Sequence, residues 1–306
     1  IFEGEEEVGS KHLPAWVEAN KERLACDVIL VSDTTMISDK VPSINCGMRG
    51  VTYLQVNVKG PDKDLHSGHY GGAVANPINT LCEMIATLID KDGRVTIPGF
   101  YDDVAVVSDA DRQELARAPF DMEEYKESIG IQEVKGEKGF TTLERTAIRP
   151  CLDVCGIWGG YTGAGSKTVL PSEAHAKISM RIVPNQKADK ILDMAAKHIL
   201  AIAPPYASVT VEKMEAGNGF LIPITSSAYK AASRAMAEVY GIEPVPSRGG
   251  GSICVLADMR NILGADPLLM GFGLERDTIH SPNESYLLRQ FYAGIESIAL
   301  FYKYWE

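Results

Sequence analysis

Hydrophobic positions near both ends of the chain follow helical and strand-like spacing in turn. Residues 11–24 carry apolar side chains at helical spacing, and the apolar run at 28–31 that follows has the length of a buried strand. The same alternation of helical and strand-like patterns returns later, with a helix at 226–240, an apolar run at 267–272 and a long helix from about 284. We therefore expect a layered α/β architecture at the two ends of the chain.

The middle of the chain has a different pattern. Residues 50–59 alternate between apolar and polar side chains, the period of a strand with one solvated face. The pattern predicts further helices at 77–90 and 187–202 and further strands at 152–158, 174–183 and 207–214. With the irregular stretch 93–150 set aside, the order is strand, helix, strand, strand, helix, strand. This is the order of the split βαβ, ferredoxin-like arrangement.

The two different hydrophobic patterns, at the ends and in the middle of the chain, predict two domains. A chain of 306 residues exceeds the size at which a single hydrophobic core keeps growing. We expect a discontinuous α/β catalytic domain from residues 1–48 and 218–306. The α+β, ferredoxin-like segment 49–217 is expected to be inserted into it.

The amino-acid composition disfavours some kinds of binding partner for this chain. The net charge of -11, without a cluster of lysine and arginine, disfavours nucleic acid. No apolar run approaches the roughly 18 residues that a membrane span needs. The six cysteines lie mostly in apolar stretches, so we expect buried free thiols and a reducing cytosol. Cys151 and Cys155 are too far apart for a CxxC site.

An acidic cluster opens the chain, which begins at Ile1 without an initiator Met. A run of glutamates is ordinarily a solvated surface, but here Gly4 and the turn at 8–10 flank it. Carboxylates at the end of an α/β strand lie where such folds place their sites. Glu6 and Glu7 could diverge, so that one binds a cation and the other takes a proton from water.

Two further side chains of metal-binding type lie at predicted strand ends. Asp33 follows the run at 28–31, and by itself favours a turn or a helix cap. His280 lies between an apolar run and a helix, where a ligand and a capping residue are equally open. Together with the opening glutamates, these residues favour one metal site in one domain.

Six motifs, in this order, resemble those of the M20 metallopeptidases. The closest branch is that of the cytosolic nonspecific dipeptidases and carnosinase-type dipeptidases. The motifs are Glu3-Gly4-x-Glu6-Glu7-x-Gly9-Ser10, Ser32-Asp33, Asp64-Leu65-His66-Ser67-Gly68-x-Tyr70-Gly71-Gly72, Met180-Arg181-Ile182-Val183-Pro184-Asn185, Gly249-Gly250-Gly251-Ser252-Ile253 and His280-Ser281-x-Asn283-Glu284. The resemblance covers essentially the whole chain, and it implies that the inserted segment is a lid and dimerisation domain.

The resemblance also implies the roles of the metal-site residues. It makes Glu6 the general base and Glu7, Asp33 and His280 metal ligands. It implies two divalent ions, zinc or manganese, and hydrolysis by a metal-bound hydroxide. The implied substrates are dipeptides or short peptides with a free C-terminal carboxylate, and the implied location is the cytoplasm.

The lid residues receive roles in the same way. The resemblance implies a homodimer in which His66 reaches the neighbouring subunit's active site and stabilises the oxyanion. It implies that Thr168 and Arg181 hold the substrate carboxylate and that Ser252 contacts the substrate. From the residues alone, His66 could be part of a polar turn, Arg181 could be solvated, and 249–251 could be only a flexible loop.

Part of the family pattern is not found in this sequence. The family also uses an upstream His-x-Asp motif and an aspartate that bridges the two metals. We therefore expect a C-terminal fragment that lacks the N-terminal part of its catalytic domain, with impaired or absent metal binding and little activity. Two alternatives stay open: an N-acyl amino acid deacylase or desuccinylase of the same superfamily, and a non-catalytic dimerisation remnant.

Overall fold

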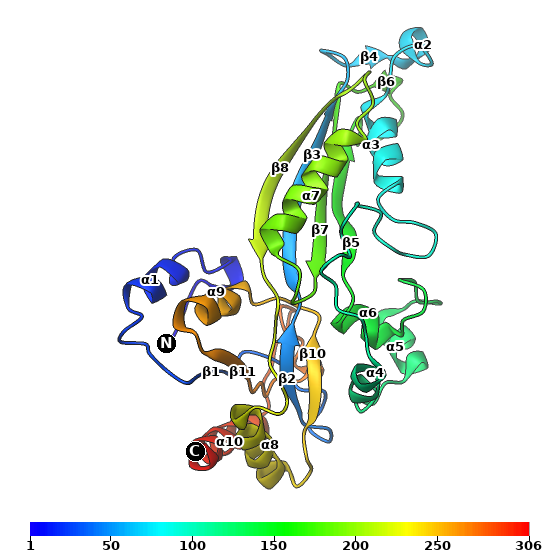
Figure 1. The fold of residues 1–306 in the computed structure, drawn as a ribbon. Coiled ribbons are helices and arrows are strands. Elements are labelled where there is room, and N and C mark those ends of the chain that lie inside the picture. The colour runs from blue at the N-terminus through cyan, green and yellow to red at the C-terminus, as the bar shows by residue number, and fades with distance from the viewer. Residues whose placement is uncertain (306) are drawn as a thin grey trace.

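Two main sheets, each with its own hydrophobic core, organise the computed structural model, which describes residues 1–305 (Figure 1). The first sheet has the strand order β1 (Val28–Val31), β11 (Asp266–Leu269), β2 (Ser43–Met48), β10 (Val245–Gly249), with β9 (Phe220–Leu221) beside β2. The second has the order β5 (Cys151–Gly159), β7 (Glu173–Ile182), β3 (Gly50–Lys59), β8 (Ser208–Gly217). The chain is thus a mixed α/β protein.

The first sheet is built from both ends of the chain. β1 pairs in parallel with β11, and β2 in parallel with β10, while a single antiparallel pair, Leu269 with Asn45, joins the two halves. Four helices accompany this sheet: α1 (Leu13–Ala19), α8 (Ser227–Tyr240), α9 (Cys254–Leu263) and α10 (Leu288–Tyr304). Its core includes the fully buried side chains of Ile44, Leu268 and Phe301.

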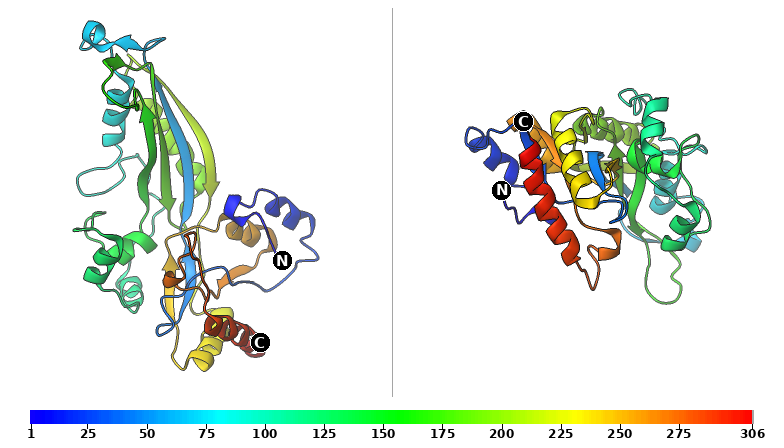
Figure 2. Two further views of the ribbon diagram at one scale, coloured as in Figure 1. Left: turned by 180° about the vertical axis from the view of Figure 1, so that it is seen from behind. Right: turned by 90° about the horizontal axis from the view of Figure 1, so that it is seen from below.

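The second sheet is entirely antiparallel and extends away from the first (Figure 1). Its alternation buries Leu54, Val56 and Val58 under α3 (Pro77–Ala86) and α7 (Ala188–Ala201), both of which pack on one face. The other face carries no helix among the described residues (Figure 2). The order β3, α3, β5, β7, α7, β8 is the one expected from the sequence. The exact boundaries of the two domains stay a prediction.

We call the second sheet, together with α3 and α7, the lid. A small two-stranded sheet forms the end of the lid that lies far from the first sheet. It pairs β4 (Leu65–His66) with β6 (Val169–Leu170), and the short helix α2 (Ser67–Tyr70) follows β4. These elements lie beyond the ends of β3 and β7 that point away from the first sheet (Figure 1). The lid is therefore a long arm with a tip of its own.

The irregular stretch 93–150 contains three short helices that hydrophobic spacing does not predict. They are α4 (Asp109–Leu115), α5 (Met122–Ile129) and α6 (Thr142–Ala147). Side chains cap each of them, with capping boxes at Ser108 and Thr141. Helices of six to eight residues are too short to show a clear period, so their caps are the signal that could have found them.

Several other predicted boundaries shift. β2, β10 and α9 were not predicted. β2 escaped prediction because it is buried along its whole length, so its side chains do not alternate between apolar and polar. The predicted helix at 77–90 ends at Ala86, and the helix predicted from about 284 begins at Leu288. No helix of the described residues is long and apolar enough to cross a membrane.

The prediction of buried thiols is wrong for most of the described cysteine side chains. Cys46 is buried, whereas Cys26, Cys82 and Cys155 are exposed and Cys151 is half-buried. An apolar neighbourhood in sequence does not bury a residue on the outer face of a helix or of an edge strand. Burial raises the pKa of the Cys46 thiol to about 12.

This difference predicts the order of thiol alkylation. Because only the thiolate reacts, Cys46 should resist iodoacetamide at pH 8 in the folded protein, while Cys26 and Cys82 are modified. Peptide mass mapping after timed quenching measures this order, and the same reaction in guanidinium chloride is the control. Modification of Cys46 at the rate of Cys26 in the folded protein would contradict the burial.

Candidate active site

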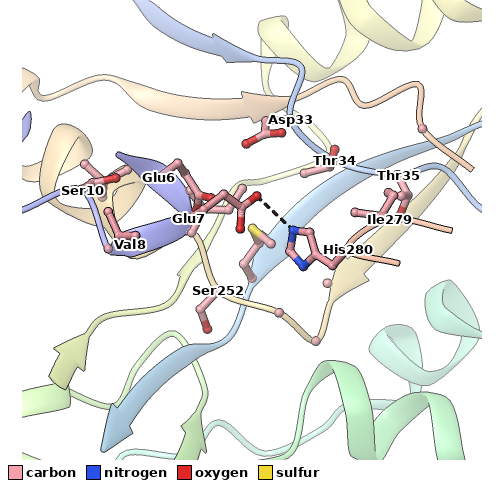
Figure 3. Close-up of a pocket in the computed structure, with 18 of the residues that line it drawn as sticks. Glu6, Glu7, Val8, Ser10, Asp33, Thr34, Thr35, Ser252, Ile279 and His280 are labelled. Atoms are coloured by element: carbon pink, nitrogen blue, oxygen red, sulfur yellow. Dashed lines mark hydrogen bonds and ion pairs between the residues drawn. The ribbon is translucent and has the colours of Figure 1, made fainter. Parts of the chain in front are cut away.

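A wide cleft at the base of the lid gathers most of the predicted site residues (Figure 3). Glu6, Glu7, Asp33, Ser252 and His280 all line it. They come from the opening turn, the end of β1, the loop after β10, and the segment before α10. Residues far apart in sequence therefore meet where the sheet strands end, as expected for an α/β site.

The opening glutamates lie on a single turn of 3-10 helix, η1 (Glu6–Val8). The turn closes through bonds from the amides of Val8 and Ser10 to the carbonyl of Glu5, at 3.0 and 2.9 Å. Gly9 then adopts a left-handed conformation, and Ser10 also has a positive φ of 48°. This tight reversal leaves Glu6 half-buried and Glu7 exposed at the cleft.

Glu7 and His280 already meet across the cleft (Figure 3). His280 Nε2 donates to Glu7 Oε1 at 3.0 Å, although both side chains are about 70% exposed (70% and 72%). His280 has a φ of 60°, and its neighbours Thr278 and Asn283 also have positive φ values. With Ser10, these are all the non-glycine residues of this kind among residues 1–305. Such strain concentrated at one place is typical of functional sites.

Glu6 has the environment of a general base. Burial, and then the negative charges of Asp33 and Glu7, raise the pKa of the Glu6 carboxyl. A carboxylate with a raised pKa takes a proton from water more readily at neutral pH. Glu6 and Asp33 both line the cleft.

The predicted metal ligands fit a divalent ion in type but not in number. Carboxylate oxygen and imidazole nitrogen suit zinc or manganese. Glu7 and His280 converge, and Asp33 lines the same cleft. Residues 1–305 nevertheless contain no group of three or more His, Cys, Asp or Glu side chains close enough to hold an ion. The ligand roles of Glu7, Asp33 and His280 therefore stay a prediction.

Arg181 and Ser252 form a second contact at the base of the lid. Arg181 Nη1 donates to Ser252 Oγ at 2.9 Å, and Ser252 Oγ donates to the carbonyl of Arg49 at 2.5 Å. Arg181 thus joins the lid strand β7 to the glycine loop after β10. Ser252 lines the cleft, and the guanidinium of Arg181 is hydrogen-bonded to it.

His66 and Thr168 lie together at the lid tip, away from this cleft (Figure 1). His66 Nε2 is 3.5 Å from Thr168 Oγ1, and His66 Nδ1 accepts from the amide of Gly68 at 3.0 Å. Within one chain, the structure does not bring Thr168 to Arg181. Arg181 pairs with Val51 at the base of the sheet, and the β3–β7 ladder runs on to the Lys59–Glu173 pair before the tip begins.

Four residues on the lid side of the cleft were missed by the sequence analysis. Tyr53, Lys177, Met214 and Glu215 line the cleft from β3, β7 and β8. Alternation places Tyr53 and Lys177 on the solvated face of the lid sheet, but it does not show that this face meets the catalytic residues.

Comparison with known proteins identifies the fold and its family. The family model described as the peptidase dimerisation domain of M20 matches residues 47–207. The chain belongs to the M20 peptidase family. Metal binding is typical of this family. The solved structure of an M20 family metallo-carboxypeptidase, Sso-CP2 from Sulfolobus solfataricus, is 31% identical with a TM-score of 0.88, over 99% of this chain and 69% of that one.

Curated M20 relatives include dipeptidases. The Cys-Gly metallodipeptidase DUG1 of Candida albicans is 32% identical over 99% of this chain, and the human Beta-Ala-His dipeptidase is 31% identical over 99%. The chain spans 64% and 61% of the length of these two relatives. The solved structure of human carnosine dipeptidase 1 has a TM-score of 0.82 at 30% identity, over 99% of this chain and 64% of that one.

The Glu7–His280 contact predicts a measurable titration. The hydrogen bond that His280 donates to Glu7, and then the charge of Glu7, raise the pKa of His280. Glu7→Gln should therefore lower the His280 pKa, measured by imidazole NMR in EDTA. Because the folded-state pKa is raised, the contact favours folding below the unfolded pKa and loses this effect as pH rises through the folded one.

Glu18→Gln is the matched control for this titration. Glu18 lies on α1 and pairs with Lys21, so its loss should leave the His280 titration where it is. A His280 pKa that is the same in Glu7→Gln and in the unchanged protein would show that the two side chains do not meet in solution.

Proposed function

We propose that the protein containing this chain is a metal-dependent peptidase that hydrolyses dipeptides or short peptides with a free C-terminal carboxylate. The observation that carries the proposal is the meeting of Glu6, Glu7, Asp33 and His280 in one cleft, beside Ser252. Membership of the M20 family and the dipeptidase names of two curated relatives support it.

The cleft divides the chemistry between neighbouring side chains. Glu7 and His280, with Asp33, are the side chains that would hold a divalent ion, which supplies a Lewis acid for the peptide carbonyl and lowers the pKa of a bound water. Glu6 lies beside them with a raised pKa. Its carboxylate accepts the proton from the attacking water and later donates it to the leaving amine.

The Arg181–Ser252 contact forms the part of the proposed site that binds the substrate carboxylate. Ser252 lines the cleft, and Arg181 is held against it. A guanidinium can bind a carboxylate through two parallel N–H groups, so Arg181 suits the C-terminal carboxylate of a peptide. The Ser252 hydroxyl orients that guanidinium at the base of the lid.

The first test replaces the proposed base. In the natural gene product that carries residues 1–306, Glu6→Gln should lower kcat for dipeptide hydrolysis about 100- to 10,000-fold, because the amide cannot accept a proton. Binding of manganese, measured by calorimetry, should survive. Glu18→Gln on the outer side of α1 is the control and should keep full activity. Undiminished turnover by Glu6→Gln would overturn the assignment.

Parallel assays separate the related activities. Dipeptides and N-acyl amino acids are compared side by side, with and without EDTA, in the same gene product. Preference for dipeptides supports the proposal, and preference for N-acyl substrates overturns it. The expectation that residues 1–306 by themselves bind metal weakly and turn over little stays a prediction, tested by the same assays on that polypeptide.

We further propose that His66 acts in a homodimer. The described residues place it with Thr168 at the lid tip, outside the cleft of its own chain. An imidazole at the end of a long arm can donate a hydrogen bond to the oxyanion in a neighbouring subunit. Thr168, at 3.5 Å, would enter that site with it.

Mixing two inactive variants tests this arrangement. Glu6→Gln and His66→Ala should each lose most activity as pure dimers. Subunit exchange at equal amounts should restore about a quarter of the original activity, because half of the dimers are mixed and one of their two sites is intact. Sedimentation checks that both variants remain dimeric. No recovery after exchange would place His66 in its own subunit's site or outside catalysis.

A further inference from the structure

The lid wall of the cleft carries a cation without a partner. Lys177, on β7, is half-buried and lines the cleft. It forms no ion pair or side-chain hydrogen bond with any of the residues 1–305. Its neighbours across the strands are Gln55 and Gly156, one neutral and one without a side chain. Lys177 is partly buried as a residue, and its ammonium has no counter-charge among the described residues, so it is free to bind an anion from the cleft.

Two β-bulges shape this part of the wall. In β5, the register against β7 shifts between Val154 and Gly156, so Cys155 is the extra residue. In β8, the register against β3 shifts between Tyr53 and Leu54, which leaves Met214 as the extra residue. Both irregularities border the same cross-strand pair, Leu54 with Ile178. Bulges re-aim side chains next to sites, and here Met214 is turned to line the cleft.

A hydroxyl donor lies next to the cation. Tyr53 lines the cleft two residue pairs closer to the sheet base than Lys177, on the same face. A tyrosine hydroxyl keeps its proton at neutral pH and can donate a hydrogen bond. Burial, and then the contact with Cys155, raise the pKa of Tyr53 further. Beside it, Ser179 Oγ is 3.1 Å from Cys155 Sγ. Glu215 also lines this wall, but it pairs with Tyr53, so β3 separates it from Lys177. Two further acids on the same sheet face, Glu212 and Asp153, pair with Gln55 and Ser179 and form no ion pair with Lys177.

We propose that Lys177 and Tyr53 form an anion-binding subsite that selects peptides with an acidic side chain in the residue before the scissile bond. Lys177 lies four residues from Arg181 on β7, about 13 Å along the strand. This distance between Lys177 and Arg181 is larger than the distance between the two carboxylates of a single acidic residue. It suits a terminal carboxylate on Arg181 and the side-chain carboxylate of the preceding residue on Lys177. The inference rests on the proposed peptidase function.

The test compares Glu-Gly with Gln-Gly, which differ only in the charge of the first side chain. In the natural gene product with manganese, kcat/KM should favour Glu-Gly. Lys177→Met should reduce that preference about 10- to 100-fold, because kcat/KM for Glu-Gly falls far more than kcat/KM for Gln-Gly, as expected for a lost hydrogen bond to a charged group. Lys177→Arg should restore it. Tyr53→Phe should reduce it about 2- to 10-fold.

Lys59→Met is the matched control. Lys59 lies on the same sheet face at the far end of β3, outside the cleft, so its loss should leave the preference intact. Calorimetric binding of both dipeptides in EDTA gives a readout that does not need turnover. Thermal unfolding checks that each variant is folded, and Lys177→Gln replaces Lys177→Met if the latter is not.

The outcomes separate the subsite from the peptidase function. Hydrolysis with no preference for Glu-Gly, or a preference that survives Lys177→Met, overturns the subsite and leaves the function standing. Tighter binding of Glu-Gly that depends on Lys177, without hydrolysis of either dipeptide, supports the subsite and overturns the function. Loss of the preference in Lys59→Met to the same degree also overturns the subsite.

Discussion

The buried guanidinium of Arg49 is the interaction on which the junction of lid and cleft depends. Arg49 lies between β2 and β3, where the chain passes from one sheet to the other, and is only 8% exposed. Its Nε donates to the carbonyl of Gly250 at 3.2 Å, and its Nη1 to the carbonyls of Arg145 and Arg149 at 3.3 and 3.2 Å. One side chain therefore ties the glycine loop to the carboxyl end of α6, where carbonyls lack helical partners.

The ion pair behind Arg49 fixes the other half of this junction. Glu137 and Arg149 are both buried, and they meet through two bonds of 2.7 Å. The Arg149 guanidinium also lies 4.2 Å from the centre of the Phe140 ring. Glu137 also accepts from Arg94 Nη1 at 2.9 Å, whereas removing Glu137 would leave the buried Arg149 without its counter-charge. These contacts hold the segment from 137 to 149 in place. The irregular stretch thereby acquires a physical role: it presents the carbonyls that Arg49 needs.

The sequence predicts those site residues whose positions follow from local patterns, such as the end of an apolar run. Asp33 and His280 each follow an apolar run, and strand ends share one edge of a sheet. The expectation of a strand end at Glu6 was wrong, because no strand precedes η1 among the described residues. Hydrophobic spacing likewise predicts β3 and β7, because one face is buried throughout. Arg49, Tyr53 and Lys177 could not be found in this way. Their roles arise from contacts between segments about 100 to 200 residues apart, such as Arg49 with Arg149 and Gly250. The bulges at Cys155 and Met214 add a single residue that no period reveals.

The lid therefore has two functional ends separated by the length of its strands. Arg181 pairs with Val51 at the base, whereas Lys59 pairs with Glu173 near the tip, eight residues along β3. At about 3.4 Å per residue this is roughly 27 Å, too far for one side chain to bridge. A histidine at the tip cannot serve the cleft at the base of the same rigid sheet without a large rearrangement. In the proposed homodimer, a symmetric pair of arms would bring each tip to the other cleft. The rigidity that Arg49 provides at the base would then set how accurately each tip is placed.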